Sequence, residues 1–212
     1  MTTPYLPQTM SDVVIDLSHW QAPVDFAQAK AGGIVAVILK ATQGTSFVDP
    51  TFASRVVEAS GAGLLLGAYH FFDTADPTAQ AGYFLATVAR TGMQMLMALD
   101  FEPSATNQAI ENNAAVFIST VRMMTGIWPV LHTGRWEVAP AQPAFQDCPL
   151  WLAEYGASPI CPPGWAEWKL WQHTDGQVGS GVAPASGVGP CDCDCFAGTI
   201  PELADWWSNL TA

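Results

Sequence analysis

Residues 95–102 read MLMALDFE, an apolar run that ends in two carboxylates, Asp100 and Glu102. Apolar runs of this length are typical of strands that are buried on both faces, as the strands of parallel sheets are. The two acids stand at positions i and i+2, so their side chains point to the same face of a strand. A surface turn whose acids simply face water is the alternative, but the apolar flank and Phe101 speak against it. The stretch therefore predicts a buried strand that ends in a pair of acids.

Seven similar apolar runs lie on either side of this stretch, and gaps long enough for helices separate the early ones. Residues 76–92 form the clearest helix, because Asp76 and Pro77 suit a helix start and Gly92 suits its end. After about residue 135, Pro and Gly become dense and the helix-sized gaps disappear. The other runs span residues 13–17, 34–39, 64–72, 127–132, 150–155, 168–173 and 190–196, and further helices fit residues 26–31, 51–60 and 106–124.

This order of elements predicts an α/β fold, an irregular TIM-like (β/α) barrel with regular βα units early and loop-joined strands late. The chain has 212 residues, fewer than the roughly 250 of a typical barrel, as the loss of helices would require. We expect one domain over residues 13–212, preceded by an N-terminal extension over residues 1–12. The Gly-rich stretch 175–189 is interpreted as a surface loop within that domain.

The composition excludes several classes of protein. Nineteen acidic and seven basic residues give a formal net charge of −12, whereas a nucleic-acid binder needs a clustered basic surface. The apolar runs are too short to insert into a membrane, and the N-terminal residues lack the pattern of a secretory signal. We therefore expect a protein made in the cytoplasm, with no nucleic-acid partner and no membrane insertion, and we expect it to be a monomer.

The chain has five cysteines, and an odd number leaves their redox state open. Cys191, Cys193 and Cys195 alternate along the last apolar run, and Cys148 and Cys161 could form a disulfide in an oxidising compartment. Small buried side chains in a reducing compartment are the simpler interpretation. A zinc site is disfavoured, because C-x-C-x-C lacks the usual C-x₂₋₄-C pairing of zinc ligands. We expect no metal and no cofactor.

Other runs also end in side chains that could serve a site. Active-site residues of α/β barrels sit at the C-terminal ends of strands. Asp16 ends the first run, beside Ser18 and Trp20, and Asp192 and Asp194 lie in the last. Taken alone, Asp16 is more typical of a helix cap or a loop anchor than of a site, and most tryptophans pack in cores. Their position at strand ends is what indicates a site that binds sugar rings.

The pair Asp100 and Glu102 indicates the chemistry. Two neighbouring carboxyl groups raise each other's proton affinity, and glycoside hydrolysis needs one protonated and one ionised carboxyl. His70 and His132 also lie near strand ends, and each is equally consistent with a structural hydrogen bond. The sequence contains no H-E-x-x-H, G-x-S-x-G or Walker pattern. The sequence therefore favours carboxylate chemistry on a glycan.

Taken together, these motifs resemble those of one family, the glycoside hydrolase family 25 lysozymes. The resemblance runs in order from about residue 13 to residue 198. The matching stretches are VIDLS at 14–18 followed by Trp20 and Gln21, KATQG at 40–44 with VDP at 48–50, GAYHF at 67–71, LDFE at 99–102, LWLA at 150–153 with Tyr155, LWQ at 170–172 and CDCDCF at 191–196. Each stretch alone is weak, but their common order is specific.

The resemblance implies an N-acetylmuramidase that cleaves the β-1,4 bond between N-acetylmuramic acid and N-acetylglucosamine in the glycan strand of peptidoglycan. Glu102 would be the general acid/base, and Asp100 would stabilise the oxocarbenium-like centre or orient the 2-acetamido group. Asp16 and Asp192 would line the same site. The residues expected to bind substrate are Trp20, Lys40, Tyr69, His70, His132, Trp151, Tyr155 and Gln172. Two positions depart from the family pattern, since Gln43 stands where an acid is common and His132 where Tyr is expected.

Two rival functions remain at this point: a non-catalytic glycan-binding barrel and a chitinase-like hydrolase on the same scaffold. The intact Asp100/Glu102 pair counts against the first. The chitinase pattern D-x-x-D-x-D-x-E, aligned on Glu102, fails at Met95 and Ala98. A compact muramidase without a secretory signal resembles a bacteriophage endolysin, so we expect release to the wall through a holin.

Overall fold

The computed structural model describes residues 9–21, 23–104, 107–138, 143–156, 158–179 and 185–211, and the statements below concern these residues. The strands are β1 (Ser11–Leu17), β2 (Ala36–Gln43), β3 (Phe47–Val48), β4 (Leu65–Phe71), β5 (Leu96–Asp100), β6 (Val130–Gly134), β7 (Leu150–Ala153), β8 (Leu170–Thr174) and β9 (Asp192–Phe196). The helices are α1 (Phe26–Ala31), α2 (Phe52–Gly61), α3 (Pro77–Ala89), α4 (Gln108–Thr125), α5 (Pro143–Gln146) and α6 (Ile200–Asn209).

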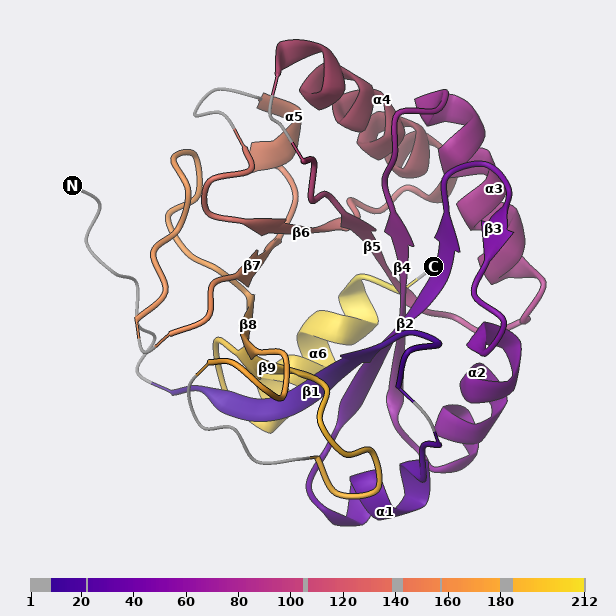
Figure 1. Cartoon of the computed structure of the whole chain (residues 1–212), viewed down its shortest axis with the longest axis vertical. Coiled ribbons are helices and arrows are strands. Elements are labelled where there is room, and N and C mark those ends of the chain that lie inside the picture. Colours follow the sequence, from indigo (N-terminus) through magenta and orange to yellow (C-terminus); the bar gives the residue numbers. More distant parts are fainter. Residues whose placement is uncertain are drawn as a thin grey trace.

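The strands close into a barrel. The order is β1-β9-β8-β7-β6-β5-β4-β2, and pairing of β1 with β2 completes the ring (Figure 1). Neighbouring strands of the ring are parallel except at β9, which is antiparallel to both β8 and β1. β3 stands outside the ring as a short antiparallel partner of the end of β2. The expected irregular TIM-like (β/α) barrel is confirmed.

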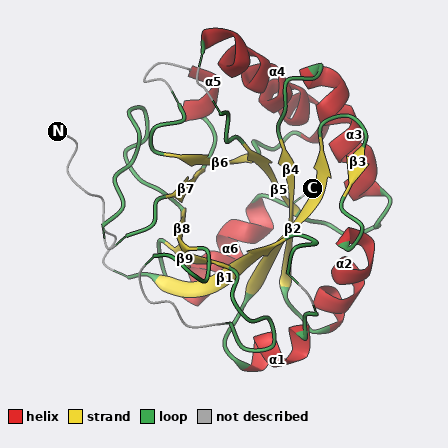
Figure 2. Cartoon of the chain, in the orientation of Figure 1, coloured by secondary structure: helices red, strands yellow, loops and turns green. Residues whose placement is uncertain are grey.

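Helices cover only part of the barrel. α1, α2, α3 and α4 lie outside the strands from β1 to β6, whereas the strands from β6 to β9 are joined mainly by loops and the short α5 (Figure 2). The early βα units and the loop-joined late strands are therefore as expected.

Alternation along the strands gives the barrel two apolar layers. Ile15 and Leu17 face outward and pack with the helices, while Val14 faces the barrel interior. α6 closes the interior at the N-terminal ends of the strands, where Trp207 packs and donates a 2.8 Å hydrogen bond from its Nε1 to the carbonyl of Leu66. The opposite end, where the parallel strands finish, is left free for a site.

Local sequence explains where the helices begin and end. The carboxylate of Asp76 accepts a 2.7 Å hydrogen bond from the backbone N–H of Ala79, and proline follows Asp76 at the first helical position. α3 ends at Ala89, and Gly92 then turns the chain with a φ of +67°. Gly126 caps α4 in the left-handed conformation, with a φ of +79°, which favours glycine.

Some details differ from the sequence-based expectations. β1 begins at Ser11, so residues 11–12 belong to the barrel, and β3 and α5 were not anticipated. The five cysteines are buried free thiols, so the disulfide between Cys148 and Cys161 that the sequence left open is absent. None of the helices in the described residues is long and apolar enough to cross a membrane.

Candidate active site

A cavity of about 270 Å³ opens at the C-terminal ends of the parallel strands. Eleven of the twelve residues that the sequence placed at the site line it, and the exception is His70. Ser18 and Phe71 line it as well. The lining residues are Asp16, Ser18, Trp20, Lys40, Tyr69, Phe71, Asp100, Glu102, His132, Trp151, Tyr155, Gln172 and Asp192.

Asp100 and Glu102 lie together, as expected from their spacing. Asp100 is the last residue of β5 and Glu102 follows two positions later. One oxygen of each carboxyl group and a ring nitrogen of His132 all lie within 4.8 Å of one another, an arrangement that could also hold a metal ion. Asp100 is buried, and its Oδ1 has no hydrogen-bond partner among the described residues. The Glu102 side chain is 41% exposed, so it can reach a bound glycan.

The surroundings of the pair favour protonation. Burial raises the pKa of Glu102 to about 7, and the negative charges of Glu137 and Asp192 add to the effect, while Lys40 opposes it. Burial also raises the pKa of Asp100 well above its ordinary value, and repulsion from Glu102 raises it further. Ionised Glu102 disfavours ionisation of Asp100, so the pair keeps a proton to higher pH than two isolated carboxyl groups would.

Glu137 was not anticipated from the sequence. It follows β6 by three residues, and its carboxylate accepts a 2.7 Å hydrogen bond from the backbone N–H of Gly134. An acid shortly after a barrel strand was the available signal.

His132 contacts the acid directly. Its Nε2 lies 3.3 Å from Oε1 of Glu102, and its ring meets the edge of Trp151 with centroids 4.3 Å apart. Burial lowers the pKa of His132 to about 3, so the imidazole is neutral. A neutral ring can accept a hydrogen bond from a protonated carboxyl or donate one to an ionised carboxylate, depending on its tautomer.

Two linked hydrogen bonds hold Asp16, a further carboxylate that lines the cavity. Asp16, near the end of β1, accepts a 2.9 Å hydrogen bond at Oδ2 from Nε2 of Gln172 on β8. The hydroxyl of Tyr155 donates to Oε1 of Gln172 over 3.2 Å. Burial raises the pKa of Asp16 well above its ordinary value, with Asp192 adding to the effect.

The antiparallel strand β9 contributes two inward-facing acids at different depths. Asp192 lines the cavity, and burial, with repulsion from Asp175, raises its pKa to about 6. Asp194 lies deeper and is fully buried, and its Oδ1 accepts a 2.5 Å hydrogen bond from Nε1 of Trp151. Asp194 therefore positions Trp151 through this hydrogen bond and does not line the cavity itself.

Lys40 is the one cation among the described lining residues. Its Nζ donates to Oε1 of Gln43 over 2.8 Å and lies 4.6 Å from the ring centre of Phe71. Burial lowers the pKa of Lys40, and the negative charge of Asp100 works against that shift. Gln43, at a position where an acid was expected, thus fixes the ammonium group without adding charge.

An exposed tryptophan stands at the rim. Trp20 is 81% exposed, and its ring lies against His19 with centroids 4.6 Å apart. Asp49 fixes this turn, because its Oδ2 lies 2.8 Å from Nδ1 of His19. Trp136 is 79% exposed but does not line the cavity. Trp20 therefore offers a flat apolar face at the entrance.

His70 does not reach the cavity, and the expectation that it binds substrate is wrong. It is fully buried on the outer face of β4, where its ring stacks on Phe117 with centroids 4.9 Å apart. Its ring nitrogens contact Oγ1 of Thr42 at 2.7 Å and Oε1 of Gln80 at 3.0 Å. Burial lowers its pKa to about 4. Its role is structural, because Tyr69, the preceding residue, takes the inward position.

Paired acids at the mouth of a β/α barrel, beside an exposed aromatic face, define the class of the protein as a glycoside hydrolase. The chain belongs to glycosyl hydrolases family 25, whose profile matches residues 15–182. It is a lysozyme, a glycoside hydrolase that acts on peptidoglycan.

Relatives and solved structures agree with this family. The chain is 33% identical to an N,O-diacetylmuramidase of Chalaropsis sp, over 76% of this chain and 86% of that protein. It is 29% identical to Lysozyme M1 of Streptomyces globisporus, over 89% of this chain and 69% of that protein. The crystal structure of a bacterial lysozyme from Streptomyces coelicolor matches with a TM-score of 0.78 and 28% identity, covering 94% of this chain and 99% of that chain.

Proposed function

We propose that the enzyme cleaves the β-1,4 bond between N-acetylmuramic acid and N-acetylglucosamine, with Glu102 as general acid/base and Asp100 as the stabilising carboxylate. The observation that carries this proposal is the position of the two acids at the end of β5, with carboxyl oxygens within 4.8 Å of each other. Glu102 has both the exposure to reach the glycosidic oxygen and a pKa near neutrality, which suits a general acid.

In the first step, protonated Glu102 donates its proton to the glycosidic oxygen as the bond from that oxygen to the anomeric carbon breaks. When the remaining proton of the pair is on Glu102, Asp100 is ionised. Its negative charge then stabilises the oxocarbenium character that develops at the anomeric carbon. Water then attacks the anomeric carbon and returns a proton to Glu102. Each turnover consumes one water and restores the enzyme.

The separation of the two acids favours retention of configuration. Inverting enzymes hold their carboxyl groups about 6.5–9.5 Å apart to leave room for a water molecule, and retaining enzymes hold them closer. One oxygen of Asp100 lies within 4.8 Å of one oxygen of Glu102. Asp100 would then either attack the anomeric carbon itself or orient the 2-acetamido group to do so. The anomeric form of the first product, followed by NMR, separates retention from inversion.

Product analysis tests the bond that is cut. Peptidoglycan digested by the enzyme is reduced with borohydride, and the reduced ends are identified by mass spectrometry. The proposal expects muramitol ends. Glucosaminitol ends would show that the other glycosidic bond is cut, and turnover of chitin without muramitol would point to the chitinase-like alternative. Release of the enzyme to the wall through a holin stays a prediction.

A further inference from the structure

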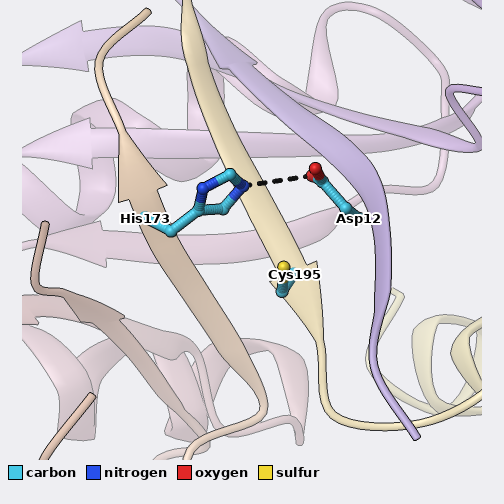
Figure 3. Close-up of side chains that lie close together, drawn as sticks. All are labelled: Asp12, His173 and Cys195. Carbon is cyan, nitrogen blue, oxygen red and sulfur yellow. Dashed lines mark hydrogen bonds and ion pairs between the residues drawn. The ribbon is translucent and has the colours of Figure 1, made fainter. Parts of the chain in front are cut away.

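A second cluster of potential ligand groups lies on the outer face of the barrel. Asp12 on β1, His173 on β8 and Cys195 on β9 come from three adjacent strands and gather on one side of the sheet (Figure 3). One ligand atom from each lies within 4.8 Å of the other two. His173 directly follows Gln172, which faces the cavity, so alternation turns His173 away from the catalytic acids.

The contacts within this cluster are close to those of a metal site. Nε2 of His173 lies 3.2 Å from Oδ1 of Asp12, and Cys195 stands on the strand between them (Figure 3). Ligands of a tetrahedral zinc ion bond at about 2.0–2.3 Å, which places them roughly 3.3–3.8 Å from one another.

The local backbone is irregular at this position. The ladder between β1 and β9 shifts register between Asp12 and Val14, and the ladder between β8 and β9 shifts between Gln172 and Thr174. Such irregularities re-aim side chains and are common beside functional sites. Here the two shifts flank β9 and accompany the convergence of the three side chains.

We propose that Asp12, His173 and Cys195 bind a zinc ion. A thiolate, an imidazole and a carboxylate are all zinc ligands, and the thiol disfavours the hard cations Mg²⁺ and Ca²⁺. The thiolate and the carboxylate together balance the charge of the ion. His173 and Cys195 are buried, whereas the Asp12 side chain is 55% exposed, so the ion enters from that side and water completes the coordination.

The site would be structural and separate from catalysis. Its three ligands join the strands around β9, the one antiparallel strand of the ring, in the part of the barrel that few helices cover. Cysteine spacing alone disfavours zinc. Spacing cannot reveal one thiol that is completed by two side chains 161 positions apart in the chain.

Zinc binding to reduced, chelator-stripped protein tests this proposal, by competition with a chromogenic zinc chelator. Cobalt is the second probe, since a bound thiolate gives a charge-transfer absorption in the near ultraviolet. We expect one tightly bound zinc per chain. Cys195→Ser and His173→Gln should each weaken binding by at least about tenfold and abolish the thiolate-to-cobalt absorption.

Two further variants serve as matched controls. Cys193→Ser removes a neighbouring thiol from the same face of β9, and Glu102→Gln disrupts the catalytic cluster that could also hold a metal. Both should keep the tight zinc and the cobalt signal. Urea unfolding of each metal-free variant shows whether it is folded. The proposal is overturned if the wild type binds no zinc in this competition, if folded Cys195→Ser binds as tightly as wild type, or if either control variant abolishes binding.

Discussion

Nε2 of Gln172 donates a 2.9 Å hydrogen bond to Oδ2 of Asp16, and this contact links strands β8 and β1 on the inside of the barrel. Strand β9 lies between them in the ring, so the two side chains meet across it. The amide thereby lowers the pKa of a buried carboxyl that burial and neighbouring acids otherwise raise.

Gln172→Leu should therefore destabilise the enzyme. The substitution leaves a buried carboxyl without its donor, which costs about 1–3 kcal/mol in the free energy of unfolding. Urea unfolding at neutral pH measures this cost. Gln177→Leu, at an exposed loop position, is the matched control and should change stability by no more than about 0.5 kcal/mol. Equal stability of the two variants would mean that the contact contributes nothing.

Trp20→Ala should impair binding and leave the fold intact. Trp20 is 81% exposed and lines the entrance, so its loss removes apolar contact area for a sugar ring. We expect kcat/KM on peptidoglycan to fall about tenfold, or ~1.4 kcal/mol, mainly through KM. Trp136→Ala is the control, because Trp136 is equally exposed and lies outside the cavity. If both variants lose activity equally, Trp20 has no special role.

Glu137→Gln should change the pH profile of the reaction. Glu137 is one of the negative charges that raise the pKa of Glu102, so its removal makes the acid ionise at lower pH. The alkaline limb of the kcat/KM profile, where the acid loses its proton, should move to lower pH, while the maximal rate stays close to that of wild type. An unchanged alkaline limb would show that the charge of Glu137 does not raise the pKa of Glu102.

Glu102→Gln should change the dependence of stability on pH. The pKa of Glu102 rises from an ordinary 4.5 to about 7 in the folded enzyme. Its contribution to stability is therefore present below pH 4.5 and is lost as pH rises to 7. The variant lacks this loss, so it should gain stability relative to wild type across that window. The side chain is partly exposed, so the gain is on the order of 1 kcal/mol. A difference that stays constant with pH would contradict the assigned pKa.

Most of the fold could be predicted from the sequence, because the barrel strands are long apolar runs with clear boundaries. β3 could not be predicted from the sequence, because a strand of two residues beside a tight turn is too short to show a periodic pattern. The lone α5 is likewise a single turn between Pro-rich segments. α6 closes one end of the barrel by packing against residues from several strands, and a local sequence pattern cannot show such long-range packing.

The inward-facing residues of the site were harder to predict from the sequence than the strands themselves. Strands buried on both faces lack the polar and apolar alternation that marks the inward side, so Tyr69 and His70 were both assigned to the cavity. Adjacent residues of a strand point to opposite faces, and only Tyr69 is inward. Phe71 lines the cavity and the charge of Glu137 acts on Glu102 through the geometry of strand ends, which spacing alone does not determine.

The most direct test of the account is the turnover number of Glu102→Gln on peptidoglycan, measured as new reducing ends, with Glu58→Gln as the control. Glu58 lies exposed on α2 and does not line the cavity, and its substitution likewise removes one carboxylate. We expect kcat to fall on the order of 10²–10⁴ in Glu102→Gln and to stay at the wild-type level in Glu58→Gln, with both variants folded. A folded Glu102→Gln enzyme that retains wild-type turnover would contradict the assignment of Glu102 as the general acid.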